Sequence, residues 1–191
     1  MAKPDKRTEI VRAALELIAE HGFHGAPMSL IAERAGVAAG TIYRYFENKD
    51  VLITELVHEL EGRIKEYVLD GYETERPIRE RFLHLTMRVF RYFIDFPLHF
   101  RYVEQFHNSP YGVVRRRERL LADTGKEDVF RILFEDGLAQ QVMKDLPIPV
   151  LTSLAFGPLV FAVRDHILGL NELDDTLIEQ ITLGCWDGVK R

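Results

Sequence analysis

The sequence has little that would suit an exported or membrane-bound protein. It contains a single cysteine, Cys185, so no intrachain disulfide can form, which fits a reducing cytoplasm. Its longest apolar run lies within residues 154–163, about half of the ~20 residues that a membrane-spanning helix needs. No apolar stretch follows the charged residues at the N-terminus, as it would in a secretory signal. We therefore expect a soluble, cytoplasmic protein.

Motifs typical of several enzyme classes are also missing. The chain has no phosphate-binding loop, no dinucleotide-binding glycine pattern and no cysteine cluster for zinc. Residues 58–62 begin like the zinc-binding helix of a protease, but Gly62 stands where the second histidine is required. We expect no enzyme activity, no cofactor and no metal site.

The net charge of −5 comes entirely from the part of the chain after residue 50. The first 50 residues carry seven basic and seven acidic side chains, whereas the rest carries 18 basic and 23 acidic ones. Affinity for DNA comes largely from neutralised phosphates, but a neutral segment can still present cations locally. The charge therefore neither supports nor excludes DNA binding.

Apolar residues recur at helical spacing along most of the chain, and no stretch alternates with the period of a strand. The pattern predicts an all-α fold, in which an N-terminal three-helix head is joined by a long helix to a C-terminal helical bundle. The expected helices span residues 5–21, 30–35, 40–46, 49–69, 77–95, 98–107, 111–122, 126–144, 148–168 and 173–189.

Four residues are expected to start or stop the helices of the head. Gly22 suits the left-handed position that ends the first helix, and Gly36 can take the positive φ of a tight turn. Ser29 is expected to cap the second helix and Asn48 the long one, because both side chains can accept a backbone N–H bond.

Residues 29–46 form the most informative segment. Two short helices joined by a glycine turn make a helix-turn-helix, whose second helix enters the major groove of DNA. Ile31, Val37, Ile42 and Phe46 are the apolar residues that can hold these helices against the first one. The remaining side chains of the second short helix are then left for DNA.

Two segments, 23–37 and 40–52, resemble the signature of the tetracycline-repressor (TetR) family. The resemblance is carried by the turn glycine, Gly40-Thr41, Tyr45-Phe46 and Lys49, which occur in the same order and spacing. The resemblance covers about residues 7–55 and fades after about residue 60. It implies that Thr41, Tyr43 and Tyr45 contact the operator and that Lys49 meets a phosphate, helped by the N–H groups at the helix start.

The candidate DNA-contacting residues are Ser29, Ala39, Gly40, Thr41, Tyr43, Arg44, Tyr45 and Lys49. For Arg44, bidentate recognition of a guanine, a phosphate contact and a solvated surface position all stay open. We expect a DNA-binding domain over residues 1–50, extending into the linking helix to about residue 69. Residues 70–191 are expected to bind ligand and to dimerise.

Aromatic residues concentrate in the middle of the chain. They can form an ordinary helical core, or they can enclose a pocket for an apolar or aromatic small molecule, which the resemblance implies. The candidate ligand-binding residues are Phe100, Tyr102, Glu104, Phe106, His107 and Phe130.

Two polar groups in this region have open roles. Glu104 and His107 share a helix face and can orient a ligand, bind metal with His84, or form surface hydrogen bonds, which is the simpler interpretation. The basic run at residues 115–119 is interpreted as a solvated face, with binding of an anionic effector as the alternative.

The last two expected helices carry broad apolar stripes, which suit a symmetric four-helix dimer interface of the kind that the family forms. The candidate interface residues are Leu151, Ala155, Leu159, Val163, Ile181 and Trp186. Cys185 is interpreted as a small buried apolar residue.

The sequence thus predicts a ligand-responsive, dimeric transcription regulator, a repressor released from its operator by a small apolar or aromatic effector. An activator or ligand-promoted regulator of the same fold is an alternative. From a different class, a degenerate helix-turn-helix that binds only proteins is another. The sequence does not identify the effector, the operator or the regulated genes.

Overall fold

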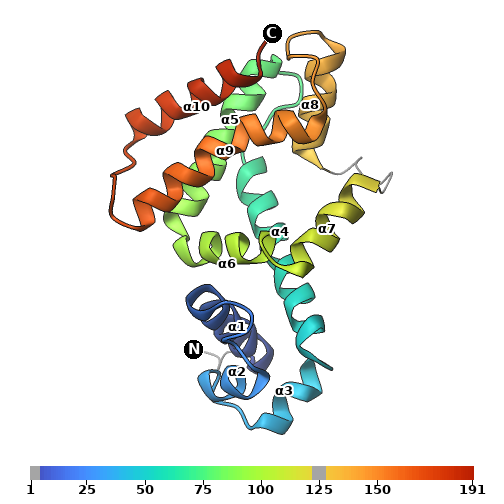
Figure 1. Ribbon diagram of the computed structural model, residues 1–191, viewed down its shortest axis with the longest axis vertical. Coiled ribbons are helices and arrows are strands. Elements are labelled where there is room, and N and C mark those ends of the chain that lie inside the picture. Colours follow the sequence, from blue (N-terminus) through green and yellow to red (C-terminus); the bar gives the residue numbers. More distant parts are fainter. Residues whose placement is uncertain (1–4, 122–127) are drawn as a thin grey trace. The chain divides into compact units, whose positions relative to one another are not determined.

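The computed structural model describes residues 5–121 and 128–191, and their regular structure is helical apart from one isolated bridge (Figure 1). The all-α prediction is confirmed. The described helices are α1 (Lys6–His21), α2 (Met28–Arg34), α3 (Ala39–Tyr45), α4 (Lys49–Leu69), α5 (Ile78–Asp95), α6 (Pro97–His107), α7 (Pro110–Leu121), α8 (Val129–Ala139), α9 (Ile148–Ile167) and α10 (Asp175–Val189).

The chain divides into two compact units. The first unit comprises residues 1–63 and 96–117, and the second comprises residues 64–95 and 118–191. Helix α6 packs against α1, so it belongs to the same unit as the head. The expected division into a DNA-binding and a ligand-binding domain near residue 70 stays a prediction.

The core of the first unit forms around α1, whose apolar residues recur on one face. Ile10, Ala14 and Ile18 are fully buried there, and Ile31 of α2 and Ile42 of α3 are fully buried as well. Because α2 and α3 turn these residues inward, the opposite face of α3 is left to the surface.

The two predicted helix caps have different outcomes. Asn48 caps α4 as predicted, since its Oδ1 accepts the N–H of Val51 at 3.0 Å. The prediction for Ser29 is wrong: α2 already includes Ser29, and its start has no side-chain cap bond. The backbone oxygen of Pro27 accepts the N–H of Ile31 at 3.0 Å, so the helix begins two residues earlier than expected.

Helix α8 is shorter than the predicted 126–144, of which residues 126 and 127 lie outside the described residues. It ends at Ala139, and Gln141 has a positive φ of 57°. Met143 then forms an antiparallel bridge with Lys190. A Cβ on Gly137 would lie 2.6 Å from the Met143 sulfur, so the Met143 side chain packs directly against this glycine. Pairing with the end of α10 therefore replaces the expected helix.

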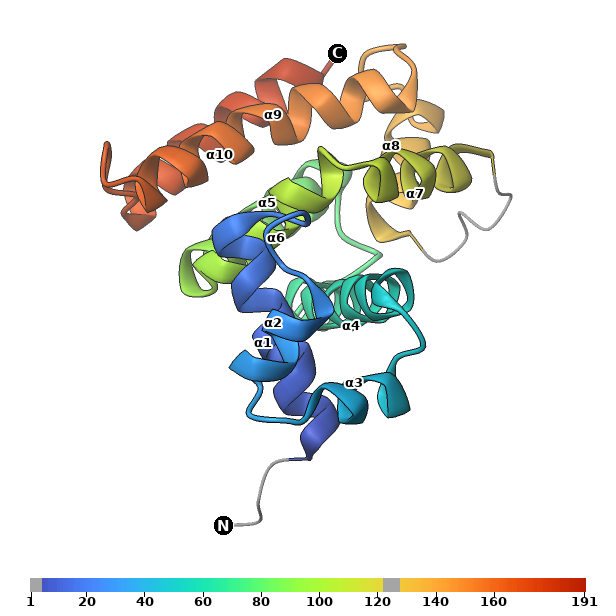
Figure 2. The same ribbon diagram turned by 60° about the horizontal axis from the view of Figure 1, so that its bottom comes forward.

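Helices α9 and α10 lie side by side in the second unit (Figure 2). By length and composition, α9 is the one helix in the described part of the chain that is long and apolar enough to cross a membrane, and 22% of that stretch is buried. A single helix of this kind is weak evidence for a membrane span. Its uncovered apolar surface is nevertheless a property that the function must explain.

Arg81 joins three segments of the second unit. Its side chain is only 5% exposed, its Nη1 donates to Asp136 of α8 at 2.8 Å, and its Nε donates to the Tyr72 hydroxyl at 2.9 Å. Burial lowers the pKa of Arg81, but the two bonds and the charge interactions with Asp136 and Tyr72 together raise it above its ordinary value. The ion pair therefore ties α5 to α8 and to the segment before α5.

Arg81→Ala is expected to lower the free energy of unfolding by about 2–3 kcal/mol, because it leaves Asp136 and Tyr72 without their partner. The loss falls below the ~3–5 kcal/mol of a fully buried pair since the Asp136 side chain is 42% exposed. Arg91→Ala on the same helix is the control, because its pair with Asp175 is exposed and worth at most ~1 kcal/mol. If urea denaturation shows the same loss in the free energy of unfolding for both variants, the structural role of Arg81 is contradicted.

Cys185 lies in the core of the same unit, 2% exposed, and burial raises the pKa of its thiol to about 11. Its interpretation as a small buried apolar residue is confirmed.

Candidate nucleic-acid interface

Helices α2 and α3 are joined by a tight turn of the predicted kind. Gly36 has φ = 67°, and its N–H bonds to the Glu33 oxygen at 3.0 Å. The N–H of Val37 bonds to the Ala32 oxygen at 3.0 Å. A side chain at Gly36 would meet no neighbour, so glycine is required by the backbone conformation alone. The result is the helix-turn-helix geometry.

The outer face of α3 carries large side chains that the head does not use for packing. Tyr43 is 56% exposed and Tyr45 is 38% exposed, and Arg44 between them is also exposed. In contrast, Ile42 and Phe46 are fully buried. Neither tyrosine is therefore a core residue.

The other candidate residues of the helix-turn-helix are exposed to different degrees. Ser29, Ala39 and Gly40 are exposed, and Thr41 is half-buried. Ala39 and Gly40 begin α3, so a DNA backbone can approach the start of this helix without meeting a long side chain. Contact of any of these residues with DNA stays a prediction.

Most arginines of the head form ion pairs with glutamates of the protein. Arg44, in contrast, has no ion-pair partner among the described residues, so its charge is available to a ligand. The paired arginines are Arg7 with Glu55 and Glu59, Arg12 with Glu9 and Glu16, and Arg34 with Glu16 and Glu20.

Lys49, the first residue of α4, donates a hydrogen bond from its ammonium to the backbone oxygen of Phe23. Burial lowers the pKa of Lys49, and the neighbouring charge of Asp50 partly opposes this shift. The Asp50 carboxylate itself accepts a hydrogen bond from the Tyr111 hydroxyl at 2.6 Å. This hydrogen bond raises the pKa of Tyr111 to about 12. The phosphate contact of Lys49 stays a prediction.

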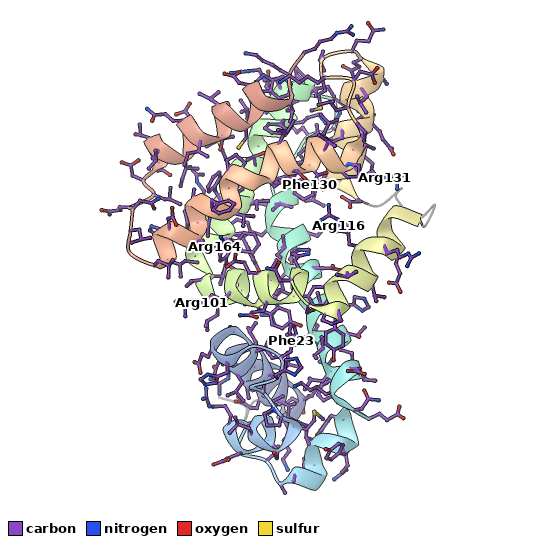
Figure 3. The ribbon with its side chains drawn as sticks, viewed as in Figure 1. Phe23, Arg101, Arg116, Phe130, Arg131 and Arg164 are labelled. Carbon is purple, nitrogen blue, oxygen red and sulfur yellow. The ribbon has the colours of Figure 1, made fainter. Side chains whose placement is uncertain are left out.

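Sequence reasoning missed Phe23 and Tyr111 as neighbours of this site. The ring centroids of these two residues are 5.4 Å apart. Figure 3 shows the position of Phe23. Phe23 opens the segment that resembles the TetR family signature, but Tyr111 lies 61 residues after Asp50, and no local pattern connects two such positions.

The candidate ligand-binding residues fall into both units. Five lie on α6 in the first unit: Phe100, Tyr102 and Phe106 are buried, Glu104 is half-buried and His107 is exposed. The Tyr102 hydroxyl donates to the Ile53 oxygen at 3.3 Å.

Phe130 lies on α8 in the second unit (Figure 3). Its ring centroid is 5.1 Å from that of Phe156. A role of the six residues in ligand binding stays a prediction.

The metal and anion alternatives have weaker support. In residues 5–121 and 128–191, no group of three or more histidines, cysteines or carboxylates is placed to hold a metal ion. Within the basic run, Arg115 pairs with Glu61 at 2.9 Å, whereas Arg116 and Arg117 are exposed. The side chain of Arg119 lies outside the described residues.

Comparison with known proteins identifies the family. The model of bacterial regulatory proteins of the tetR family matches residues 10–56, and a tetracyclin repressor-like C-terminal domain matches residues 77–190. The chain belongs to the TetR family. TetR regulators are soluble transcription regulators that bind operator DNA and small-molecule effectors and act as dimers.

Curated relatives match part of the chain, and solved structures match nearly all of it. The fatty acid metabolism regulator protein of Bacillus subtilis is 39% identical over 79 residues, 41% of each chain. The chain thus spans about two fifths of the length of this curated relative. A putative TetR-family regulator from Vibrio parahaemolyticus is 32% identical, with a TM-score of 0.77 over 98% of this chain and 99% of that one.

A further solved structure of similar fold, that of the FadR regulator of B. subtilis in complex with stearoyl-CoA, is 20% identical with a TM-score of 0.71. It covers 94% of this chain and 95% of that one, and this likeness shows the fold alone.

Most of the predicted dimer-interface residues already lie in the core of the protomer. Such side chains leave little surface for a second copy, and their role in a dimer interface stays a prediction. Ile181 is half-buried and keeps a surface for a partner. The core residues are Leu151, Ala155, Leu159, Val163 and Trp186.

The exposed apolar residues of α9 form a separate stripe. Val150, Leu154 and Phe161 are 42%, 39% and 62% exposed. Their spacing places them on one helix face, on the side of α9 roughly opposite Leu151 and Leu159. Both faces carry apolar residues in the sequence, so periodicity alone did not separate the buried face from the exposed one.

Proposed function

We propose that this chain is a dimeric, cytoplasmic repressor, released from its operator by a mostly apolar or aromatic effector. One state of the dimer spaces the two α3 helices for successive major grooves, about 34–36 Å apart, and a second state does not. An effector that binds the second state better lowers operator affinity by at most its difference in affinity for the two states.

The observation that carries this proposal is the outer face of α3. Tyr43, Arg44 and Tyr45 project from a short helix whose inner residues are fully buried. The two tyrosines, which are 56% and 38% exposed, supply ring edges and hydroxyls. The arginine has no ion-pair partner among the described residues and supplies a cation. These are groups that contact bases and phosphates in a major groove.

For the dimer, we propose the exposed stripe of α9 together with the outer face of α10. Leu154 and Phe161 supply apolar area, and Ile181 lies half-buried on α10. Apart from the backbone of α10 itself and the adjacent residues, no atom lies within 4 Å of the position of a Cβ on Gly184, so a partner helix can approach closely. Two such helix pairs can form a four-helix bundle.

Two observations support an apolar or aromatic effector: the aromatic residues of the second unit and the ligand of one protein of similar fold. Phe156 packs edge-on against Phe130 and Phe134, with centroid distances of 5.1 and 6.4 Å. Such rings suit an apolar chain or ring. Since a related fold binds stearoyl-CoA, long-chain acyl-CoA is the first effector class to test.

The test measures binding to DNA that flanks the protein's own gene. Wild-type protein is expected to bind it specifically, and Tyr43→Ala to bind at least tenfold more weakly with an unchanged melting temperature. Val113→Ala, on a side chain 63% exposed in the same unit, is the matched control and should bind as wild type. Absence of specific binding by wild type would refute the proposal.

The same assay separates the alternatives. An effector that strengthens binding would identify a ligand-promoted regulator. A protein that retains its fold but binds no DNA would favour the degenerate helix-turn-helix that contacts proteins.

A prediction concerns Lys49. Lys49→Met is expected to weaken binding to all DNA sequences similarly and to reduce the slope of log Kobs against log[salt] by about 0.9 per protomer. A matched Lys65→Met variant, at an exposed position of α4, should leave the slope unchanged. A loss confined to one base position would contradict a phosphate contact.

A further inference from the structure

Phe23 connects the α6–α7 pair to the start of α4. It follows Gly22, whose positive φ of 70° ends α1 and turns the chain. The Phe23 ring lies 6.1 Å from the ring of Tyr102 on α6 and 5.4 Å from that of Tyr111 on α7. Two helices outside the helix-turn-helix therefore fix where Phe23 lies, all within the first unit.

The backbone of the same residue holds Lys49, because the Phe23 carbonyl accepts a hydrogen bond from the Lys49 ammonium. A carboxylate stands next to this lysine in the sequence, but the Tyr111 hydroxyl binds Asp50 at 2.6 Å. In the described residues Lys49 forms no ion pair with a carboxylate. Its closest partner is thus a neutral oxygen, which orients the ammonium without neutralising its charge.

We propose that Phe23 is a positioning residue for the phosphate contact of Lys49, so that the packing of α6 and α7 on Phe23 sets how tightly the head binds the DNA backbone. This inference rests on the proposed DNA-binding function. An ammonium has three N–H donors, and one bond to a carbonyl leaves two for a phosphate oxygen.

The physical gain is preorganisation. A lysine side chain loses considerable rotamer freedom when it is fixed, and this loss weakens any contact that must order it. Holding Lys49 before DNA arrives removes part of that cost. If the ring contacts of Phe23 loosen, its carbonyl moves and Lys49 must be ordered again on the DNA.

The main experiment compares Phe23→Leu, Lys49→Met and the double variant by binding to the flanking DNA at several salt concentrations. Phe23→Leu is expected to lower affinity about 3- to 10-fold for each protomer on the operator, the usual effect of ordering one long side chain. In the Lys49→Met background the same change should have less than a twofold effect. Phe23→Tyr, which keeps the aromatic ring, should restore wild-type affinity.

Tyr111→Phe is the matched variant, because it keeps the ring against Phe23 and removes only the bond to Asp50. Because this change frees Asp50 to neutralise its neighbour, Lys49→Met should cause a smaller loss of affinity in the Tyr111→Phe background than in the wild-type background. Independent, multiplying effects of Phe23→Leu and Lys49→Met would overturn the inference. So would higher affinity in Phe23→Leu, since the carbonyl would then withhold Lys49 from DNA.

A second measurement needs no DNA and so separates this inference from the proposed function. Acetylation of Lys49 in the folded protein should be slower than that of the exposed Lys65, because the Lys49 ammonium is half-buried and hydrogen-bonded. Phe23→Leu should raise the Lys49 rate severalfold and leave Lys65 unchanged. An unaltered ratio in a variant that keeps its melting temperature would refute the positioning role even if wild type binds DNA.

Discussion

Phe161→Glu is expected to convert the dimer into a monomer that stays folded, whereas Leu159→Glu should unfold the second unit. Both residues lie on α9, two positions apart, but Phe161 is 62% exposed and Leu159 only 1%. A glutamate at 161 is solvated in the monomer and would be buried without a partner only in the dimer. At 159 the same charge has no solvated position in the fold.

The expected magnitudes differ accordingly. Phe161→Glu should change protomer stability by about 0.5 kcal/mol or less, as at other surface positions, while the dimer dissociates at micromolar concentration. Leu159→Glu should cost more than about 4 kcal/mol, since it buries a charge in an apolar core. Sedimentation and circular dichroism measure the two effects separately.

Val113→Glu is the matched control, because Val113 is 63% exposed on α7 and lies outside the proposed interface. It should leave both the dimer and the melting temperature unchanged. A Phe161→Glu protein that still sediments as the wild-type dimer would show that this stripe of α9 is not the interface.

The helix-turn-helix could be predicted from the sequence because local constraints determine it. Gly36 is needed for a positive φ, Asn48 accepts an N–H at a helix start, and Ile42 and Phe46 must be buried together. Each of these requirements involves residues a few positions apart. Such requirements leave a recognisable pattern in the sequence.

The features that could not be predicted depend on distant partners. The bridge between Met143 and Lys190 ends a segment whose apolar spacing favours helix. The bond between Tyr111 and Asp50 joins α7 to α4 across 61 residues. The two apolar faces of α9 differ only in what packs on them, and composition does not reveal which face the protomer covers.

Phe106→Ala is expected to lower the free energy of unfolding by about 3–5 kcal/mol, as for other buried aromatic residues, and to weaken operator binding with it. Phe106 is 5% exposed, and its ring stacks on that of the fully buried Tyr102 with centroids 6.3 Å apart. The Tyr102 ring in turn packs against the Phe23 ring, with centroids 6.1 Å apart. Both residues belong to the first unit, which also contains the head. Loss of the ring should therefore disturb the packing that supports the DNA-binding helices.

Leu98→Ala on the same helix is the control, since Leu98 is 37% exposed and its loss should cost less than about 1 kcal/mol. The measurements are the melting temperature, operator affinity and effector response of each variant. A Phe106→Ala protein with normal stability and normal operator affinity but an altered response to effector would contradict the core role. That outcome would instead make Phe106 part of a pocket, because a residue that only lines a cavity can lose its side chain without loss of the surrounding packing. Parallel loss of stability and operator binding is the result that the burial of Phe106 and its stacking on Tyr102 lead us to expect.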